Sequence, residues 1–332
     1  MRFLLCRERA PPSDFSVAIV GGGPAGLAAA GGLLCAGHSV TVFEAMPEAG
    51  GILVFGIPDH RVDKRSVRLG VRELMDNGVF FVFNTRVGRD VRLESLVEVF
   101  DSVVIATGAW RSRRLNAPGE ESGWVLRALE WLSLVHLARL GYEPFGRLVK
   151  PEGRVLVVGA GYTAVDVVTV LLDYPELRSR VESITLSYRR SRREAPSGAA
   201  SLEELERRGV RILEYTTPVG FREEERGRVV ELAKTRITES GSVEVTSEKI
   251  EIEVDYVLLA IGLEPAPLPT ELELKRRSDG TLVVDEKMMT SIPGVFACGD
   301  AVHGPSRIGV AIKSGLRVAR SVDSYLRSSK RL

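Results

Sequence analysis

Glutamine is absent from this chain of 332 residues, and asparagine occurs only three times, at Asn77, Asn84 and Asn116. Lysine is also scarce, because only eight of the 45 basic residues are lysine. Few thermolabile amides are typical of thermophilic proteins, whereas an arginine bias also arises from a GC-rich genome. A thermophilic source is therefore a hypothesis, which a melting temperature in the ordinary mesophilic range would contradict.

Cysteine is equally scarce, since the chain has only Cys6, Cys35 and Cys298 and no Cys-x-x-Cys pair. An odd number at wide spacing predicts no disulfide framework. Without a close pair, neither a dithiol redox centre nor an iron–sulfur cluster held by this chain alone is expected. We interpret Cys298 as a small buried residue. His, Cys and carboxylate residues do not follow metal-ligand spacing, so we expect no metal.

Long apolar runs and an excess of one charge are missing as well. The apolar runs have strand length or contain glycine, which argues against a membrane-spanning helix. The net charge of +1 gives no reason to expect nucleic acid or an anionic membrane as a partner. The start of the chain is too short and too charged for a signal peptide. We therefore expect a cytoplasmic protein of two domains whose first 15 residues, polar and with prolines, are loosely held.

One stretch is organised as strand, glycine turn, helix and second strand. Residues 17–20 are a short apolar run typical of buried parallel strands, and Gly21, Gly23 and Gly26 then form a GxGxxG pattern. The first glycine permits a tight turn, the second lets the backbone approach a pyrophosphate, and the third lets the helix pack on the strand. Glu44 ends the second strand, where its carboxylate can accept hydrogen bonds from ribose hydroxyls. The stretch predicts a dinucleotide site, with a structural glycine turn as the alternative.

The same pattern returns further along the chain. Residues 154–158 form a second apolar run, and Gly159 and Gly161 open a GxGxxA pattern. The next strand, 184–187, is followed by the basic run 188–193 instead of an acid. Arginines at this place can bind the 2′-phosphate of NADP, whereas a solvated basic loop is the alternative. The two units together predict FAD and NADPH as cofactors.

The remaining segments alternate helices and strands, as in an α/β protein. We expect helices over 66–77, 125–140 and 309–325, and strands over 79–83, 103–106 and 256–262. An alternation of charged and apolar residues over 219–254 predicts an antiparallel meander. The Pro-Gly pair at 118–119 marks a turn and the expected end of the first domain segment.

These motifs, in this order, resemble those of the small (β) subunit of glutamate synthase and its relatives, including NADPH-dependent ferredoxin oxidoreductases and the reductase portion of dihydropyrimidine dehydrogenase. The matching stretches are GGGPAGLAAA, GGILVFGIPDHR, ATGA, GAGYTAVD, YRRSRREAP, AIGLEP and GVFACGDAVHGPS. The resemblance implies an α/β fold with two Rossmann-like dinucleotide-binding domains. An extension over 1–14 would precede a split FAD-binding domain over 15–118 and 289–332, with an NAD(P)H-binding domain over 119–288 between its parts.

The resemblance also implies which residues hold the cofactors. FAD would contact the first turn, the acid after it, a glycine loop, and the Gly-Asp motif with the helix that follows, namely Gly21, Gly23, Pro24, Ala25, Gly26, Glu44, Gly51, Arg61, Val87, Thr107, Gly108, Gly299, Asp300, Gly309 and Ala311. The positive end of that last helix would face the flavin O2. NADPH would contact the second turn and the basic run, namely Gly159, Gly161, Tyr162, Thr163, Arg189, Arg190, Arg193 and Gly262.

The chain departs from the family in two residues and one domain. Tyr162 stands where an Asn is usual, and Val310 where a Glu is usual. Family members generally carry an N-terminal domain with cysteine ligands for iron–sulfur clusters, whereas only fifteen residues precede the first strand here. We therefore expect a flavoprotein without that domain, which would need another chain to take its electrons.

The resemblance implies hydride transfer from NADPH to the flavin N5 and then electron transfer to a separate iron–sulfur protein, a ferredoxin or a synthase large subunit. Because the flavin carries this chemistry, we name no catalytic residue. We interpret His60 and His303 as structural or solvated, with a place near the flavin as the alternative. A stand-alone NAD(P)H oxidase or quinone-type reductase and a non-catalytic FAD-containing assembly subunit stay open as functions, and a homo-oligomer stays open as a state.

Overall fold

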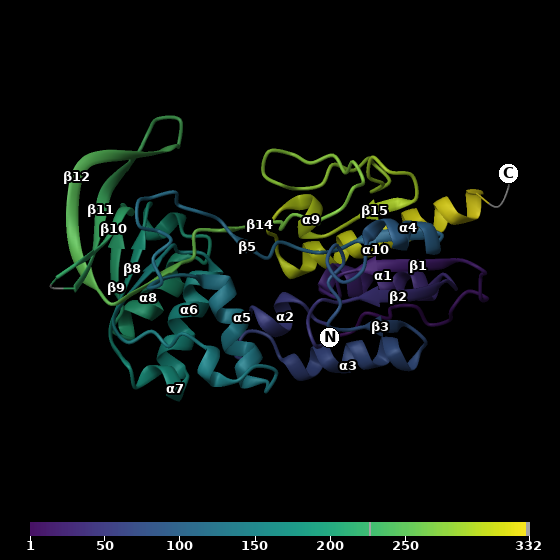
Figure 1. The fold of residues 1–332 in the computed structure, drawn as a ribbon, viewed down its shortest axis with the longest axis horizontal. Coiled ribbons are helices and arrows are strands. Elements are labelled where there is room, and N and C mark those ends of the chain that lie inside the picture. Colours follow the sequence, from purple (N-terminus) through teal and green to yellow (C-terminus); the bar gives the residue numbers. More distant parts are fainter. Residues whose placement is uncertain (226, 330–332) are drawn as a thin grey trace. The chain divides into compact units, whose positions relative to one another are not determined.

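The computed structural model describes residues 1–225 and 227–329, and its contacts divide the chain into two compact units (Figure 1). Unit 1 comprises Met1–Arg111 and Leu263–Leu332, and unit 2 comprises Ser112–Gly262. These boundaries differ from the expected ones. The Pro-Gly turn belongs to unit 2, because Phe221 N donates to Pro118 O at 2.9 Å. Residues 263–288 belong to unit 1, where Leu282 N donates to Ala301 O at 2.8 Å.

Unit 1 is built on a five-stranded parallel sheet in the order β15-β4-β1-β2-β3. Its strands are β1 (Ser16–Val20), β2 (Ser39–Phe43), β3 (Phe80–Val82), β4 (Ser102–Ile105) and β15 (Val295–Ala297). The central strand β1 is almost fully buried, as its apolar sequence predicts. The chain runs from β1 to β2 and β3 on one side and places β4 and β15 on the other, so the order reverses at β1. In such sheets ligands bind beyond the carboxyl ends of the strands at this reversal.

The helices of unit 1 include two long ones that pack closely on each other. They are α1 (Pro24–Cys35), α2 (Ile52–Phe55), α3 (Lys64–Asp76), α4 (Leu93–Val99), α9 (Asp300–His303) and α10 (Ile308–Ser329). A Cβ on Gly32 of α1 would lie only 2.7 Å from the Cβ of Ala319 of α10, so a small residue is needed there. The expected helices over 66–77 and 309–325 are thus confirmed. Across the described ranges, the structure has no helix with the length and apolar character that a bilayer crossing requires.

The first residues of the chain contradict two predictions, because they are tightly held and contain a disulfide. Cys6 is bonded to Cys35 at the end of α1, with their Cα atoms 5.9 Å apart, and only Cys298 keeps a thiol. Phe3 is 1% exposed. A Cβ on Gly31 of α1 would lie 2.1 Å from Phe3 O. The small residues of the helix therefore leave room for this arm, and this tertiary packing brings two cysteines together that are distant in the sequence.

Unit 2 contains a second five-stranded parallel sheet, in the order β6-β13-β7-β8-β9. The strands are β6 (Val125–Arg127), β7 (Gly153–Val158), β8 (Val181–Tyr188), β9 (Arg211–Glu214) and β13 (Tyr256–Leu259). The helices are α5 (Ala128–Arg139), α6 (Tyr162–Asp173), α7 (Pro175–Arg178) and α8 (Ala199–Arg207), with short 3-10 turns η1 (Phe145–Arg147) and η2 (Arg192–Glu194). The helix expected over 125–140 begins three residues later than predicted, because its first residues form β6 beside β13.

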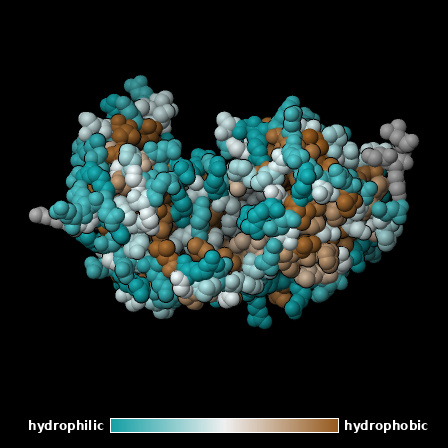
Figure 2. Space-filling view, in the orientation of Figure 1, coloured by the Kyte–Doolittle hydropathy of each residue, from teal (hydrophilic) through white to brown (hydrophobic). Residues whose placement is uncertain are grey.

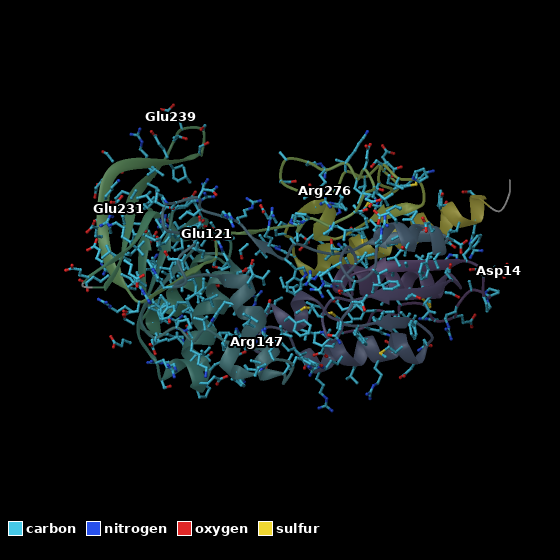
Figure 3. The ribbon with its side chains drawn as sticks, in the orientation of Figure 1. Asp14, Glu121, Arg147, Glu231, Glu239 and Arg276 are labelled. Carbon is cyan, nitrogen blue, oxygen red and sulfur yellow. A yellow bond between two sulfur atoms is a disulfide. The ribbon has the colours of Figure 1, made fainter. Side chains whose placement is uncertain are left out.

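The expected meander is confirmed as a three-stranded antiparallel sheet of β10 (Thr216–Glu224), β11 (Gly227–Ile237) and β12 (Val243–Val254). It covers one face of the parallel sheet: Leu156 and Val158 of β7 pack with Phe221 and Val230, while Val155 and Val157 pack toward the helices. Its outer surface is largely hydrophilic (Figure 2). Glu231, labelled in Figure 3, pairs there with Lys249 at 2.7 Å. Two short strands, β5 (Arg111–Ser112) and β14 (Leu263–Glu264), form a separate two-stranded sheet.

Candidate functional site

The first glycine turn joins β1 to α1, and each of its glycines has a different local requirement. Gly21 has φ +105°, and a Cβ there would lie 2.6 Å from Ala106 O. A Cβ on Gly26 would lie 1.9 Å from Gly21 O, so only glycine fits. A Cβ on Gly23, in contrast, would meet no described atom within 4 Å. Gly23 therefore faces open space, as expected of the residue that a pyrophosphate approaches.

The start of α1 is suited to an anion. Gly23 precedes the helix and Pro24 is its first residue; the described residues give the helix neither a side-chain cap nor an acid in the first turn. The first N–H groups of a helix lack partners within the helix and carry a partial positive charge. A phosphate at this end would receive these hydrogen bonds without competition from a carboxylate.

Glu44, the acid after β2, is buried beside this turn and is 5% exposed. Its carboxylate accepts a hydrogen bond from Gly22 N at 2.7 Å and another from Met46 N at 2.8 Å. Burial raises the pKa of the Glu44 carboxyl, although these two N–H groups oppose the shift. The carboxylate is thus held in one orientation against the turn, where it keeps acceptor capacity for further donors.

The glycine loop 50–51 lies against the same turn. Gly50 N donates to Gly22 O at 2.8 Å. Gly51 has φ +54°, and a Cβ there would lie 2.8 Å from the Cα of Gly23. The predicted residue Gly51 is therefore in contact with the predicted residue Gly23.

The far end of the chain returns to the first turn. A Cβ on Gly299 would lie 2.7 Å from the Cβ of Ala25, and a Cβ on Gly315 of α10 would lie 2.1 Å from Ala25 O. Gly299 N also donates to the Ser314 hydroxyl at 2.9 Å. Ser314 and Gly315 were not predicted, because their signal in the sequence is no more than a pair of small residues within the expected helix.

Asp300, the first residue of α9, follows this contact. It accepts a hydrogen bond from the Ser306 hydroxyl at 2.6 Å. Burial raises the pKa of the Asp300 carboxyl, although that hydrogen bond opposes the shift. Burial therefore disfavours the charged form of Glu44 and, separately, that of Asp300, and such shifts in pKa are common at functional sites.

The other predicted FAD residues are placed less directly. Thr107 and Gly108 follow β4, which neighbours β1, and a Cβ on Gly21 would lie 3.3 Å from the Cα of Thr107. Four predicted FAD residues remain. Arg61 and Gly309 are exposed, whereas Val87 and Ala311 are buried.

The second glycine turn joins β7 to α6 in unit 2. Gly159 has φ +120°, and a Cβ there would lie 2.3 Å from Ala260 O, whereas a Cβ on Gly161 would meet no described atom within 4 Å. Within the described part of unit 2, α6 has neither a side-chain cap nor an acid in its first turn. The second turn therefore offers a phosphate the same open helix end as the first. Tyr162 is 46% exposed at this end, and Thr163 follows it.

The basic run after β8 divides into two kinds of arginine. Arg190 donates to Glu194 at 2.8 Å and to Gly241 O at 2.9 Å. Arg192 donates to Glu206 at 2.8 Å and to Glu214 at 2.5 Å. Arg189 and Arg193 are exposed, and their side chains make no hydrogen bond or ion pair with the residues that the structure describes. The run is therefore not a uniformly solvated loop. Arg190 and Arg192 fix it through their hydrogen bonds, whereas Arg189 and Arg193 are available to an anion.

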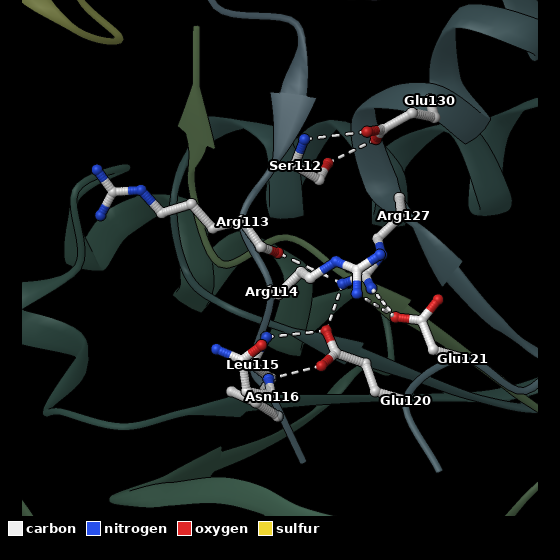
Figure 4. Close-up of polar contacts among 9 residues, drawn as sticks. All are labelled: Ser112, Arg113, Arg114, Leu115, Asn116, Glu120, Glu121, Arg127 and Glu130. Atoms are coloured by element: carbon white, nitrogen blue, oxygen red, sulfur yellow. Dashed lines mark hydrogen bonds and ion pairs between the residues drawn. The ribbon is translucent and has the colours of Figure 1, made fainter. Parts of the chain in front are cut away.

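Gly262 follows β13 and lies beside the start of unit 2. It has φ +114°, and its carbonyl accepts a hydrogen bond from Arg113 N at 2.9 Å. Figure 4 shows the neighbouring network, in which the Glu120 carboxylate accepts from Leu115 N at 2.8 Å and Asn116 N at 2.6 Å and pairs with Arg127. Burial alone would raise the pKa of Glu120, but these hydrogen bonds hold it below its usual value.

A cavity of about 500 Å³ opens beside this network. None of the predicted cofactor residues lines it; its lining consists of Arg114, Asn116, Ala117, Gly119, Glu120, Glu121 and Ser122. The cavity is therefore separate from the predicted cofactor residues of unit 2.

Comparisons with known proteins identify the family of the chain. A family model described as pyridine nucleotide-disulphide oxidoreductase matches residues 15–315. The glutamate synthase [NADPH] small chain of Azospirillum brasilense is 34% identical, with 97% of this chain and 69% of that one aligned. The NADP(+)-dependent formate dehydrogenase subunit beta of Moorella thermoacetica is 35% identical over 95% of this chain, which spans 44% of that subunit.

A solved structure shows the same fold. Mycobacterium tuberculosis FprA in complex with NADPH matches with a TM-score of 0.84 at 21% identity, covering 97% of this chain and 86% of that one. Both the two-domain α/β architecture and the dinucleotide-binding type of fold predicted from the sequence are thereby confirmed.

Proposed function

The chain belongs to the pyridine nucleotide-disulphide oxidoreductase family and to its glutamate synthase small-chain relatives, and on this basis we propose that it is a FAD-dependent NADPH oxidoreductase. FAD would bind unit 1 and NADPH unit 2. The observation that carries this proposal is the pair of open helix ends, one beside a buried carboxylate and the other accompanied by two exposed arginines. A carboxylate suits ribose hydroxyls and guanidinium groups suit a 2′-phosphate.

The residues of unit 1 fit FAD. Gly23 leaves the space that a Cβ would fill, and the start of α1 presents N–H groups to the pyrophosphate. Glu44, oriented by Gly22 and Met46, would accept from the ribose, and Asp300 would contact the ribityl or pyrophosphate part. Gly309 and Ala311 lie in the first turn of α10, whose positive end would stabilise negative charge on the flavin. When bound, FAD would supply the redox chemistry, since it can accept a hydride and pass the electrons on.

The residues of unit 2 fit NADPH. Gly161 leaves open space at the start of α6, and Arg189 and Arg193 would hold the 2′-phosphate. Arg190, which was also predicted to bind NADPH, donates to Glu194 and to Gly241 O and would hold the basic run in place beside the bound coenzyme. Tyr162 and Thr163 begin α6 after β7, and Gly262 follows β13, so these three residues would contact NADPH from the carboxyl edge of the sheet.

The electron acceptor would be a separate protein. The relatives from Azospirillum and Moorella are named as a chain of a synthase and a subunit of a dehydrogenase, which supports a partner such as an iron–sulfur protein, a ferredoxin or a synthase large subunit. The cytoplasmic location stays a prediction.

Anaerobic mixing of the FAD-loaded protein with NADPH and, separately, NADH tests the proposal through the flavin absorbance. We expect rapid bleaching by NADPH. In Arg189→Ala and Arg193→Ala the apparent affinity for NADPH should fall roughly tenfold or more, as for the loss of a charge-assisted hydrogen bond, with little change for NADH. Arg207→Ala is the matched control, because Arg207 is exposed on α8 and pairs with Glu204. Bound flavin that neither coenzyme bleaches would overturn the proposal.

A further inference from the structure

Tyr215 has an unusual backbone conformation next to the basic run of unit 2. It follows β9 and has φ +55°, a left-handed conformation that glycine and asparagine adopt far more readily than a bulky aromatic residue. The residue is 39% exposed. No hydrogen bond, ion pair or ring contact joins its side chain to the residues described. No polar or ring contact with the described residues therefore accounts for a tyrosine here, and residues in such conformations occur often at functional sites.

The fold places Tyr215 directly beside Arg189. In the parallel pair β8 and β9, Tyr188 is opposite Glu214, and Arg189 and Tyr215 each follow the end of one of these strands at the carboxyl edge of the sheet. Tyr215 N also donates to Arg190 O at 3.4 Å. Thr235 of β11 connects both: its N–H donates to Tyr215 O at 2.9 Å, and its hydroxyl donates to Arg189 O at 2.9 Å. Tyr215 and Arg189 are thus held as one local unit.

From this placement we propose that the Tyr215 ring stacks on the adenine base of NADPH. This inference rests on the proposed function. The 2′-phosphate is attached to the ribose that carries the adenine, so the residues that hold the phosphate lie close to the base. In this class of fold the adenosine half lies beyond the end of the second strand of the unit, which is β8 here. The base offers two flat faces, and an exposed aromatic ring beside the phosphate-binding arginine can cover one of them.

Arg189 and Tyr215, which are neighbours in the fold, would have different roles in coenzyme binding. Arg189 would distinguish NADPH from NADH through the 2′-phosphate, whereas Tyr215 would contribute equally to both coenzymes, because both carry adenine. If Tyr215 only set the local backbone conformation, removing its ring would not weaken the binding of the adenine that both coenzymes carry.

Calorimetric binding of adenosine 2′,5′-bisphosphate, which carries the adenine and the 2′-phosphate but no nicotinamide, tests the proposal. Tyr215→Asn removes the ring and suits the backbone conformation, and Tyr215→Phe keeps the ring. We expect binding to weaken about tenfold in Tyr215→Asn and to stay within about twofold of wild type in Tyr215→Phe. The absorbance change of the stacked adenine near 260 nm should be present in wild type and Tyr215→Phe and absent in Tyr215→Asn.

Tyr142→Asn is the matched control, since Tyr142 is an equally exposed tyrosine of unit 2 (43%). Equal binding by wild type and Tyr215→Asn, while NADPH still bleaches the flavin, would overturn the role of Tyr215 and leave the proposed function intact. A wild-type protein that neither binds the bisphosphate nor responds to NADPH would overturn both.

Discussion

Gly26 in unit 1 and Ala164 in unit 2 occupy the same position of the two glycine turns. A Cβ at Gly26 would lie 1.9 Å from Gly21 O, whereas the Cβ of Ala164 is fully buried and accommodated. The first helix therefore approaches its turn more closely than the second. A side chain at this position therefore has no room in the first turn, whereas the second turn accommodates a methyl group.

The strand that follows each turn differs as well. In unit 1 the second strand is followed by Glu44, a buried carboxylate that accepts hydrogen bonds from backbone N–H groups. Unit 2 ends the corresponding strand with exposed arginines that are braced by Arg190, Arg192 and their carboxylate partners. Burial holds the carboxylate of unit 1 and surface ion pairs hold the basic loop of unit 2, so the two sites should respond differently to mutation.

The largest expected effect comes from exchanging the third turn residue. Gly26→Ala places a methyl group against the carbonyl of Gly21, and we expect it to destabilise unit 1 by about 3 kcal/mol or more and to reduce bound FAD. The reverse exchange, Ala164→Gly, should cost only about 1–2 kcal/mol, from helix propensity and one lost methyl group. Denaturant unfolding and the flavin content of the purified proteins measure both effects. Equal losses in the two variants would show that the turns have the same packing requirement.

The next largest effect is the loss of stability that breaking the disulfide should cause in unit 1 but not in unit 2. Unit 1 has the Cys6–Cys35 disulfide, whose cysteines have a sequence separation of 29, whereas the described part of unit 2 contains no disulfide and many arginine–carboxylate pairs. Reduction, or Cys35→Ser, should destabilise unit 1 by about 2–4 kcal/mol.

Hydrogen exchange measured region by region is the readout for the disulfide. It should speed up in α1 and α3 and stay unchanged in α6, and Cys298→Ser is the control. Uniform acceleration in both units would contradict a local role. The hypothesis of thermophily stays a prediction, and the melting temperature of the oxidised protein tests it.

The smallest effect is a pH dependence confined to unit 1. His38 is bonded to the Ser13 hydroxyl at 2.7 Å and to Asp323 at 3.0 Å, and so connects the arm with α10. Burial lowers the pKa of His38 from 6.5, although Asp323 opposes the shift. The unfolded chain therefore binds a proton more readily, so this contribution to stability is complete above pH 6.5 and decreases as the pH falls below it.

His38→Gln cannot titrate in this range and tests the assignment. We expect the variant to be less stable at neutral pH but to lose less of its remaining stability between about pH 7 and about pH 5. Hydrogen exchange in α1 and α10 measures this, with α6 as the internal reference. An unchanged pH profile would show that another group is responsible.

Much of the architecture was predictable because its signals are local. The buried parallel strands β1 and β7 are short apolar runs, and the glycines that their turns require follow them directly in the sequence. Both turns, the meander and the closing helix were therefore located from residues that are adjacent in the sequence. The acid at 44 and the basic run at 188–193 were visible for the same reason.

The predictions that failed involve residues that meet only in the folded chain. The arm was expected to be loose because its own sequence is polar, yet Gly31 of α1 leaves room for Phe3, and this brings Cys6 to Cys35. The domain boundary was placed at a local Pro-Gly signal, although that turn is bonded to β10 within unit 2.

The sequence by itself determined the class of fold and the two dinucleotide turns, because backbone conformation and strand burial follow from neighbouring residues. Only the tertiary structure decided which arginines are braced and which stay exposed, that α10 returns to Ala25, and that Tyr215 lies beside Arg189. These outcomes depend on strand register and helix packing between distant segments, and no local pattern contains that information.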